Sequence, residues 1–280
     1  MRDGRIQATV EQHPELMGQY GVRLAWQALN GNKIQTYIPT PLDLITHEAF
    51  DKKIALFISH LQNPFFKSLY HGAQEAADLF GTELVVFDAQ NDDSQQLSAM
   101  LSTVKAEVSV LIVNPANSDT IAPGIELANE KKIPVITVDR KCTGGKIVCH
   151  IESDNIEGGK MAGNALVRYL GGKGRIVEME GIPGTSATQE RGMGFNQVIR
   201  EHSQMKVVAR ETAFFGRKMA RETMLRLLQT GVHFDAVFAH NDNMILGVLG
   251  AMESAKYNRP RVLIGFDAIR EAVYAVKQGK

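Results

Sequence analysis

Short β-branched runs alternate in this chain with longer amphipathic stretches, and several of the runs stop at polar or aromatic side chains. Parallel strands that are buried on both faces read as apolar runs of this kind, and intervening helical patterns are typical of βαβ units. Ligands of open α/β sheets bind beyond the carboxyl ends of the strands. We therefore expect a parallel α/β fold with a ligand site at the strand ends. Five runs end in this way: IQATVEQ (6–12), IALFISHLQNPFF (54–66), PVITVDR (134–140), FDAVFAHND (234–242) and VLIGFD (262–267).

Strand and helix patterns from residue 54 onward form two series, separated by the stretch KCTGGKIVCHIESDN (141–155), which we interpret as hairpin-like. The first series predicts strands at 54–59, 83–87, 108–113 and 135–138, and helices at 64–80, 94–105 and 121–131. The second predicts strands at 175–180, 206–210, 236–239 and 262–266, and helices at 158–170, 188–201, 217–231, 242–255 and 268–279. Two similar series with a non-helical connection indicate two lobes rather than one continuous sheet.

The first 50 residues fit this alternation poorly. They predict a strand at 6–12, a helix at 14–30 and a proline-punctuated strand at 38–46. The inward-facing stripe of the helix is expected to consist of Leu16, Tyr20, Leu24, Ala25 and Leu29. One helix and two short strands cannot bury their own apolar faces, so this piece must complete another lobe.

The charge balance argues against some classes of partner. Lys and Arg together number 31, as do Asp and Glu, so no net field favours nucleic acid or an anionic membrane. No apolar stretch approaches the roughly 20 residues that a membrane helix needs. The N-terminus lacks the apolar core of a signal peptide, so the sequence taken literally predicts a cytoplasmic protein.

No cofactor or metal is expected. The sequence contains neither CxxC nor HExxH, and no GxGxxG follows a strand. Cys142 and Cys149 are the only cysteines. A disulfide between them requires that their Cβ atoms face each other, and we expect two free thiols instead.

Several long segments, in order, resemble the periplasmic ribose-binding proteins of ABC import systems. The resemblance implies two Rossmann-like lobes joined by a three-segment hinge, the type I periplasmic binding protein fold. His240 stands where a glutamine is frequent in that family. The similar segments are NPFF (63–66), NPANSD (114–119), IPVITVDR (133–140), ESDN (152–155), EGIPGTSATQERGMGF (180–195), FAHNDNM (238–244) and IGFDA (264–268).

The order of segments departs from that family in one place. There, the segment similar to residues 6–46 follows the helix similar to AIREAVYAVKQGK (268–280) and ends the protein, whereas here it comes first. We therefore expect a circularly permuted chain whose hinge strands cross at Gln12–His13, Pro41–Leu42 and Ser153–Asp154. The short link at the old termini leaves a monomer and a strand-exchanged dimer as alternatives. The predicted first lobe is 13–41 plus 52–153, and the predicted second lobe is 1–12 plus 42–51 plus 154–280.

The resemblance implies ten ligand-binding residues and favours D-ribose, with D-allulose or another monosaccharide as alternatives. Buried sugar hydroxyls need hydrogen-bond partners; carboxylates accept, guanidinium donates, amides do both, and aromatic rings cover C–H faces. Each residue also has a structural interpretation: a core phenylalanine, a surface Asp–Arg pair, an asparagine helix cap or a solvated helix arginine. The ten residues are Gln12, Asn63, Phe65, Phe66, Asp139, Arg140, Arg191, Phe215, Asn241 and Asp267.

The function implied by the resemblance is sugar capture by hinge closure, with a membrane permease of an ABC importer as partner and a periplasmic location. No catalysis is expected. Three alternatives are open: the effector domain of a sugar-responsive transcriptional regulator, a receptor ectodomain, and a sugar-modifying enzyme that uses Asp139 or Asp267.

Overall fold

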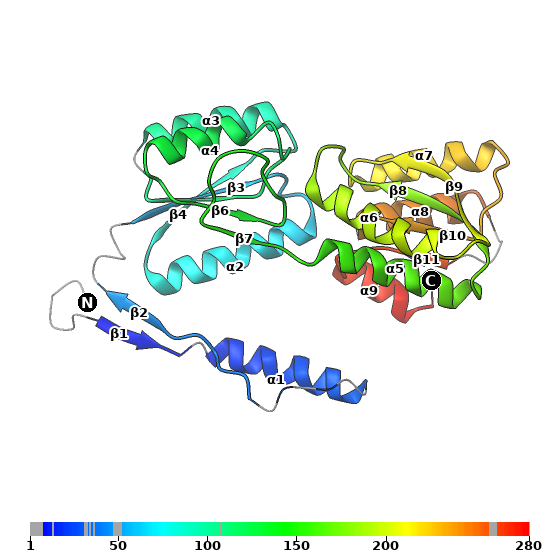
Figure 1. The fold of residues 1–280 in the computed structure, drawn as a ribbon, viewed down its shortest axis with the longest axis horizontal. Helices are drawn as coiled ribbons and strands as arrows, with labels where there is room; N and C mark the ends of the chain where they lie inside the picture. Colours follow the sequence, from blue (N-terminus) through cyan, green and yellow to red (C-terminus); the bar gives the residue numbers. More distant parts are fainter. Residues whose placement is uncertain are drawn as a thin grey trace. The chain divides into compact units, whose positions relative to one another are not determined.

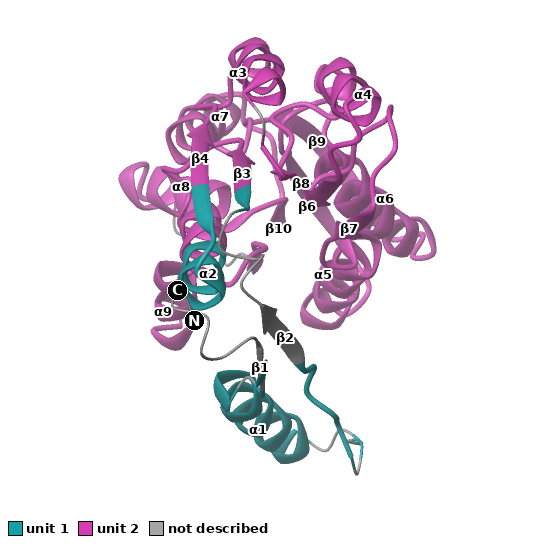
Figure 2. Cartoon of the chain, turned by 90° about the vertical axis from the view of Figure 1, so that its left-hand side faces the viewer, with its two compact units in different colours: residues 1–53, 73–84 teal, residues 54–72, 85–280 magenta. Residues whose placement is uncertain are grey.

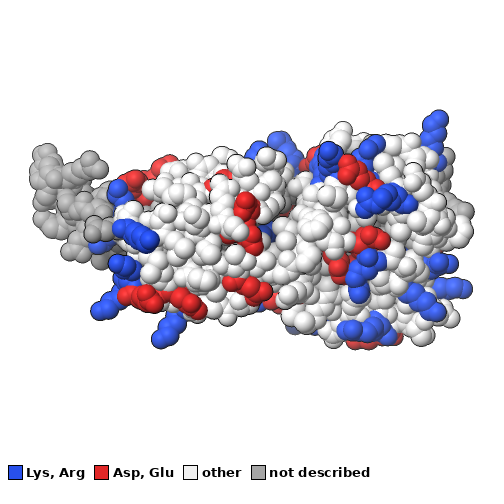
Figure 3. Space-filling view, turned by 90° about the horizontal axis from the view of Figure 1, so that it is seen from above, with Lys and Arg blue, Asp and Glu red and all other residues white. Residues whose placement is uncertain are grey.

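The computed structural model describes residues 8–12, 14–30, 33, 35, 37–46, 52–106, 108–257 and 262–279 (Figure 1). It divides into two compact units, residues 1–53 with 73–84 and residues 54–72 with 85–280 (Figure 2). No helix in the described part is long and apolar enough to cross a membrane. On the face seen in Figure 3, basic and acidic side chains are interspersed.

A five-stranded sheet, with strand order β4-β3-β5-β6-β7, forms the centre of what we call the first lobe. β3, β5, β6 and β7 run parallel. The run that predicted β3 is buried throughout its centre, which is why it contains only apolar residues between Ala55 and Ile58. The lobe consists of β3 (Lys53–Ile58), α2 (Pro64–Phe80), β4 (Glu83–Asp88), α3 (Asp93–Lys105), β5 (Val110–Val113), α4 (Ala122–Glu130), β6 (Val135–Val138) and β7 (Cys149–Ile151).

The hairpin-like interpretation of 141–155 is wrong. β7 pairs with β6 in the parallel sense, with Ile136 opposite Cys149 and Val138 opposite Ile151. Parallel neighbours need a crossover rather than a tight turn, and residues 139–148 make that crossing without a helix. Both cysteines are free, as expected.

A four-stranded sheet, with strand order β11-β10-β8-β9, forms the second lobe. All its neighbouring strands are parallel, so the expected α/β fold with two sheets is confirmed. The lobe consists of α5 (Asn155–Leu170), β8 (Gly174–Glu180), α6 (Ser186–Arg200), β9 (Met205–Thr212), α7 (Arg217–Gln229), β10 (Ala236–Ala239), α8 (Asp242–Ser254), β11 (Val262–Ile264) and α9 (Arg270–Lys277).

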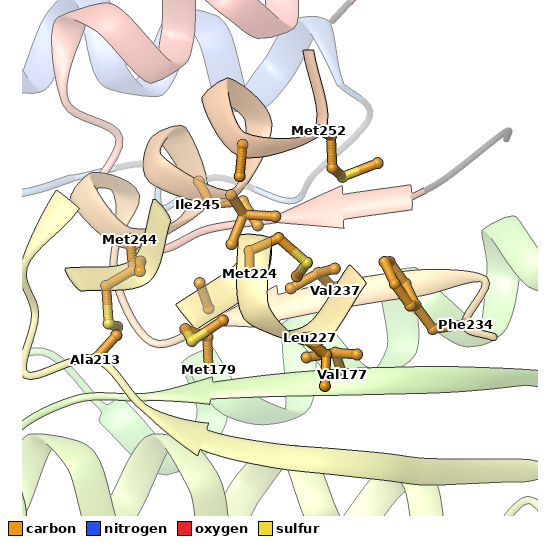
Figure 4. Packing of buried hydrophobic residues seen from close by; sticks show 14 residues of the cluster. Val177, Met179, Ala213, Met224, Leu227, Phe234, Val237, Met244, Ile245 and Met252 are labelled. Atoms are coloured by element: carbon orange, nitrogen blue, oxygen red, sulfur yellow. The ribbon is translucent and has the colours of Figure 1, made fainter. Parts of the chain in front are cut away.

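Both faces of the second sheet are buried. On one face, Val177 and Val237 from the sheet pack against Met224 of α7 and Met244 of α8 (Figure 4). On the other, the rings of Phe195 and Phe238 lie 4.5 Å apart. This double burial explains why β10 consists of apolar residues only.

The N-terminal elements are β1 (Ala8–Glu11), α1 (Pro14–Leu29) and β2 (Asp43–Thr46), with β1 and β2 antiparallel. The predicted helix and strands are present, but the strand at 38–46 is confined to its last four residues. α1 has no buried residue, and Leu29 is 87% exposed. The prediction that Leu16, Tyr20, Leu24, Ala25 and Leu29 face inward stays a prediction, because it concerns the packing of this unit against another part of the chain.

Helices α5 and α6 pack closely because glycines line their contact. A Cβ on Gly194 would overlap the carbonyl oxygen of Ile156, and one on Gly159 would overlap that of Arg191. Backbone cannot yield as a flexible side chain can, so any larger residue forces the helices apart.

We predict that Gly194→Ala lowers the free energy of unfolding by about 1–3 kcal/mol, because the added methyl group meets backbone. Gly250→Ala is the matched control, since Gly250 lies in α8 with nothing within 4 Å of its would-be Cβ. The control should be neutral or stabilising by up to about 1 kcal/mol. Urea denaturation measures both, and equal effects would contradict the close helix contact.

Candidate functional site

One pocket brings together nine of the ten predicted site residues, with both lobes contributing. The first lobe supplies an amide, two aromatic rings, a carboxylate and a guanidinium group. The second lobe supplies the same kinds of group and one small apolar residue that the sequence did not indicate, Ala187. The lining residues are Asn63, Phe65, Phe66, Asp139, Arg140, Ala187, Arg191, Phe215, Asn241 and Asp267.

Strand ends position most of these side chains. Asn63 follows β3, Asp139 follows β6, Phe215 follows β9, Asn241 follows β10 and Asp267 follows β11. Because all these strands are parallel within their sheets, their carboxyl ends lie at one edge of each sheet. The pocket therefore occupies the place where the strand-end pattern predicts a ligand site.

Three lining residues have unusual backbone conformations. The φ angle is 63° at Asp139, 59° at Phe215 and 110° at Asp267, and none of them is glycine. Positive φ is costly for residues with a side chain and persists where surrounding structure imposes it, commonly at functional sites. The chain leaves each strand in a sharp bend that turns the side chain into the pocket, and no sequence pattern signals this.

Arg191 is held from three sides. Its Nε donates to Asn155 Oδ1 at 2.9 Å and its Nη1 donates to the His240 carbonyl oxygen at 2.6 Å. Its guanidinium lies 3.8 Å from the centre of the Phe266 ring. Only 4% of the residue is exposed, so the interpretation as a solvated helix residue is wrong.

Arg140 is buried between two aromatic rings. Its guanidinium carbon lies 5.4 Å from the ring centres of both Phe66 and Phe215. Its Nη1 donates to the Pro115 carbonyl oxygen at 2.9 Å, and its Nε lies 3.7 Å from Asp139 Oδ2. The side chains of Arg140 and Asp139 are only 3% and 11% exposed, so the surface-pair interpretation is wrong. The Nε is buried without a hydrogen bond to the described residues, which makes it available to a ligand acceptor.

The two pocket asparagines also serve as helix caps. Asn241 Oδ1 accepts from Met244 N at 2.9 Å and caps α8, while its Nδ2 donates to the Phe215 carbonyl oxygen. Asn63 Oδ1 accepts from Phe65 N at 3.0 Å at the start of α2. The capping interpretation is thus correct, and it explains how these amides are fixed beside the pocket.

A buried amide behind the pocket, Asn114, joins three strand ends. Its Oδ1 accepts from Ser59 N at 3.0 Å, and its Nδ2 lies 3.2 Å from both the Val138 carbonyl oxygen and Asp139 Oδ2. Sequence reasoning included this residue in a similar segment but gave it no function. Its hydrogen bonds orient the Asp139 carboxylate, which is a supporting task.

A second supporting network lies behind Arg191. His240 Nε2 lies 3.1 Å from Glu178 Oε1, and both side chains are fully buried. Burial alone raises the pKa of Glu178, but the hydrogen bonds from His240 and Asn196 and the charge of Arg210 produce a net lowering. Glu178 is an internal strand residue, so its polarity within an apolar run was the only available signal, and sequence reasoning missed it.

Asp267 is the most perturbed carboxyl group in the pocket. Burial raises its pKa to about 7, and the nearby carboxylates of Asp242 and Asp139 act in the same direction. Arg191 Nη1, 3.5 Å away, opposes this shift without cancelling it. Near neutral pH the group can therefore either donate or accept a hydrogen bond.

Because the pKa of Asp267 is raised, we predict that the free energy of unfolding of the protein and that of its Asp267→Asn variant differ by an amount that changes with pH. A pKa raised in the fold contributes stability that is present below the unfolded value near 3.8 and is lost as pH rises through about 7. Asn cannot ionise, so the variant should gain stability relative to the parent as pH rises, by at most about 1.4 kcal/mol per pH unit.

Urea denaturation at about pH 5.5 and about pH 8.5 measures the stability difference between the parent and Asp267→Asn. These values lie about 1.5 units below and above pH 7. Glu130→Gln removes an exposed carboxylate outside the pocket and serves as the charge control. A stability difference between parent and Asp267→Asn that does not change with pH would contradict the raised pKa.

Gln12, the tenth predicted residue, lies directly after β1 in the other compact unit and is exposed. Its part in a ligand site stays a prediction, as do all the predicted boundaries of the two lobes. His13 lies outside the described residues. Within the described part of the chain, no group of three or more His, Cys, Asp or Glu side chains is placed to hold a metal ion.

Residues 54–280 match a family model described as a periplasmic binding protein domain. Among curated proteins, the ribose import binding protein RbsB of Haemophilus influenzae is 43% identical over 227 residues, 81% of this chain and 77% of the relative. The protein of the same name from Escherichia coli K12 is 41% identical over 81% of this chain and 76% of the relative.

Two solved structures show the same fold. An ABC transporter solute binding protein from Bacillus halodurans with bound myo-inositol superposes with a TM-score of 0.79 at 31% identity, over 84% of this chain and 82% of that one. A Caulobacter myo-inositol binding protein superposes with a TM-score of 0.78 at 29% identity, over 81% of this chain and 78% of that one. From the family match over residues 54–280 and the curated relatives above 40% identity, the chain belongs to the periplasmic binding protein family.

Proposed function

We propose that this protein is the sugar-binding component of an ABC import system and that it captures D-ribose between its lobes. The curated relatives above 40% identity are named for ribose import. The observation that carries the proposal is the pocket itself, in which nine residues expected of a ribose site lie together. No electron or group transfer is required of any of them.

The pocket chemistry suits an uncharged polyol. Asp139 and Asp267 can accept hydroxyl protons, Arg140 and Arg191 can donate, and the amides of Asn63 and Asn241 can do either. Hydrogen bonds to charged groups are the stronger ones, so the two Arg and two Asp side chains would fix the orientation of the sugar. The rings of Phe65, Phe66 and Phe215 supply apolar surface for the C–H faces.

We propose hinge closure as the mechanism. Neither lobe carries the whole set of polar groups, so a sugar that bridges both lobes favours the closed arrangement over the open one. Of the three predicted hinge segments, Ser153–Asp154 lies on the connection between β7 and α5. A permease of the importer would then recognise the closed form, and the periplasm is the expected location.

A ribose titration tests the proposal. We expect micromolar or tighter binding by isothermal titration calorimetry and an upward shift of the melting temperature. Asp267→Ala should lose at least about tenfold in affinity, because it removes a charged acceptor and leaves Arg191 buried without its ion-pair partner. Absence of heat and of a melting shift in the parent would overturn ribose as ligand.

Two further measurements on the purified protein test other ligands and an enzymatic function. D-allulose, D-allose and myo-inositol, titrated in parallel, would reveal a preference for another polyol; solved relatives hold myo-inositol and D-allose. Chromatography of ribose after prolonged incubation tests for an enzyme, and any converted sugar would contradict a pure binding function.

Gln12 provides a separate prediction from the resemblance. If residues 1–12 complete the sugar site, Gln12→Ala should weaken ribose binding by about 1 kcal/mol, the cost of one neutral hydrogen bond. Gln35→Ala, at another described position near the N-terminus, is the control. Unchanged affinity in Gln12→Ala would remove this residue from the site.

The oligomeric state is a separate question, and size-exclusion chromatography would distinguish a monomer from a strand-exchanged dimer.

A further inference from the structure

A cluster of charges joins the two lobes outside the pocket. Lys141 follows Arg140 in the first lobe, and its Nζ lies 2.5 Å from Oε1 of Glu190, a residue of α6 in the second lobe. The same Nζ lies 2.6 Å from Oε1 of Glu152, on the connection between the lobes. None of these three side chains lines the pocket, so the cluster does not depend on contact with a ligand.

Two further hydrogen bonds cross between the lobes near this cluster. The Lys141 backbone N donates to Ser186 Oγ, in the first turn of α6, at 2.9 Å. Ser118 N donates to the Gly184 carbonyl oxygen at 3.3 Å. Lys141 is therefore tied to the second lobe through both its backbone and its side chain.

The cluster continues to the pocket through Asn155. The Asn155 amide nitrogen lies 3.3 Å from Glu152 Oε2 and 3.5 Å from Glu190 Oε2, while its oxygen accepts from Arg191 Nε. Lys141 thus lies between the carboxylates of Glu152 and Glu190, both of which also accept from the Asn155 side-chain amide. Without the cation, the two carboxylates would repel each other in the closed arrangement.

The burial of these groups decides how strongly salt acts on them. The Lys141 side chain is 44% exposed, against 18% for Glu152 and 15% for Glu190. Hydrogen bonds to Glu152 and Glu190 raise the pKa of Lys141, so it stays charged at neutral pH. A half-exposed ion pair is screened by dissolved salt, whereas the buried Arg and Asp charges of the pocket are screened far less.

We propose that Lys141 is a positioning residue for lobe closure: its ion pairs with Glu190 and Glu152 stabilise the closed arrangement independently of the sugar and thereby tighten sugar binding. The proposal rests on the proposed function, since closure is taken as the binding step. The measured affinity scales with the fraction of protein that can adopt the binding-competent state. Removing the cation lowers that fraction without touching the ligand.

This arrangement has a consequence that a purely structural lysine would not have. Ribose carries no charge, so salt cannot weaken its binding by screening the ligand itself. A rise of the ribose Kd with ionic strength would therefore report charges that attract one another when the lobes close.

The test compares Lys141→Met with Lys141→Arg and with Lys146→Met. Lys146 is an exposed lysine that lies, like Lys141, between β6 and β7. At low salt, Lys141→Met should raise the ribose Kd about two- to tenfold, with a faster dissociation rate. Lys141→Arg keeps the charge and should stay close to the parent, as should Lys146→Met. Added sodium chloride should weaken binding by the parent and affect Lys141→Met much less.

Two results would overturn the proposal: an unchanged Kd in Lys141→Met, or the same salt dependence in that variant as in the parent. If the parent itself binds no ribose, the proposed ligand fails, and small-angle scattering of the sugar-free proteins then tests the ion pair alone. Lys141→Met should have a larger radius of gyration than the parent because its lobes open more often. Identical scattering profiles would contradict the positioning of the lobes by Lys141.

Discussion

Two arginines and two aspartates are buried together where the strands of both sheets end, and this arrangement of charge governs the rest of the site. Each of these side chains is at most 11% exposed, and each arginine has a carboxylate within 3.7 Å. Burial of an unpaired charge is costly, so these groups are tolerated only with partners held in good geometry. The raised pKa of Asp267 shows that its pairing with Arg191 does not fully offset burial. A ligand hydroxyl that donates a hydrogen bond to the Asp267 carboxylate would further offset the cost of burying its charge.

Holding the charges requires residues that never reach the pocket. Asn114 orients Asp139, Asn155 and the His240 carbonyl orient Arg191, and Glu178 fixes His240 in turn. The left-handed backbone at Asp139, Phe215 and Asp267 belongs to the same scheme, because strained conformations persist only where surrounding contacts impose them. The glycine contact between α5 and α6 brings Asn155 within reach of Arg191. Side chains held in this way lose little conformational entropy when a ligand binds to them.

Much of the architecture was predictable because strands and helices differ in the period of their apolar residues. The alternation from residue 54 onward predicted every strand and helix of both lobes except β7. The polar strand ends indicated seven of the ten residues around the pocket, and the family resemblance added Arg191 and Phe215. The stretch 141–155 was misinterpreted because a run such as KIVCHIE resembles one arm of a hairpin, and local sequence does not reveal which neighbour a strand pairs with. The spacing of apolar residues in α1 identified the helix. That spacing does not reveal which surface would bury them, and α1 has no buried residue.

Ambiguity of single residues was resolved only by three-dimensional contacts. Arg191 has the sequence context of any helix arginine, and its burial follows from Phe266 and His240, which are distant in the chain. Lys141, Glu152 and Glu190 meet although they lie on three different segments, so no spacing rule reveals their ion pairs. The sequence by itself determined the alternating α/β fold and the residue types at the strand ends, since both depend on local period and polarity. Tertiary structure alone decided which of those polar groups are buried, which pairs share charge and which backbone bends aim them, because these properties arise from contacts between segments far apart in the chain.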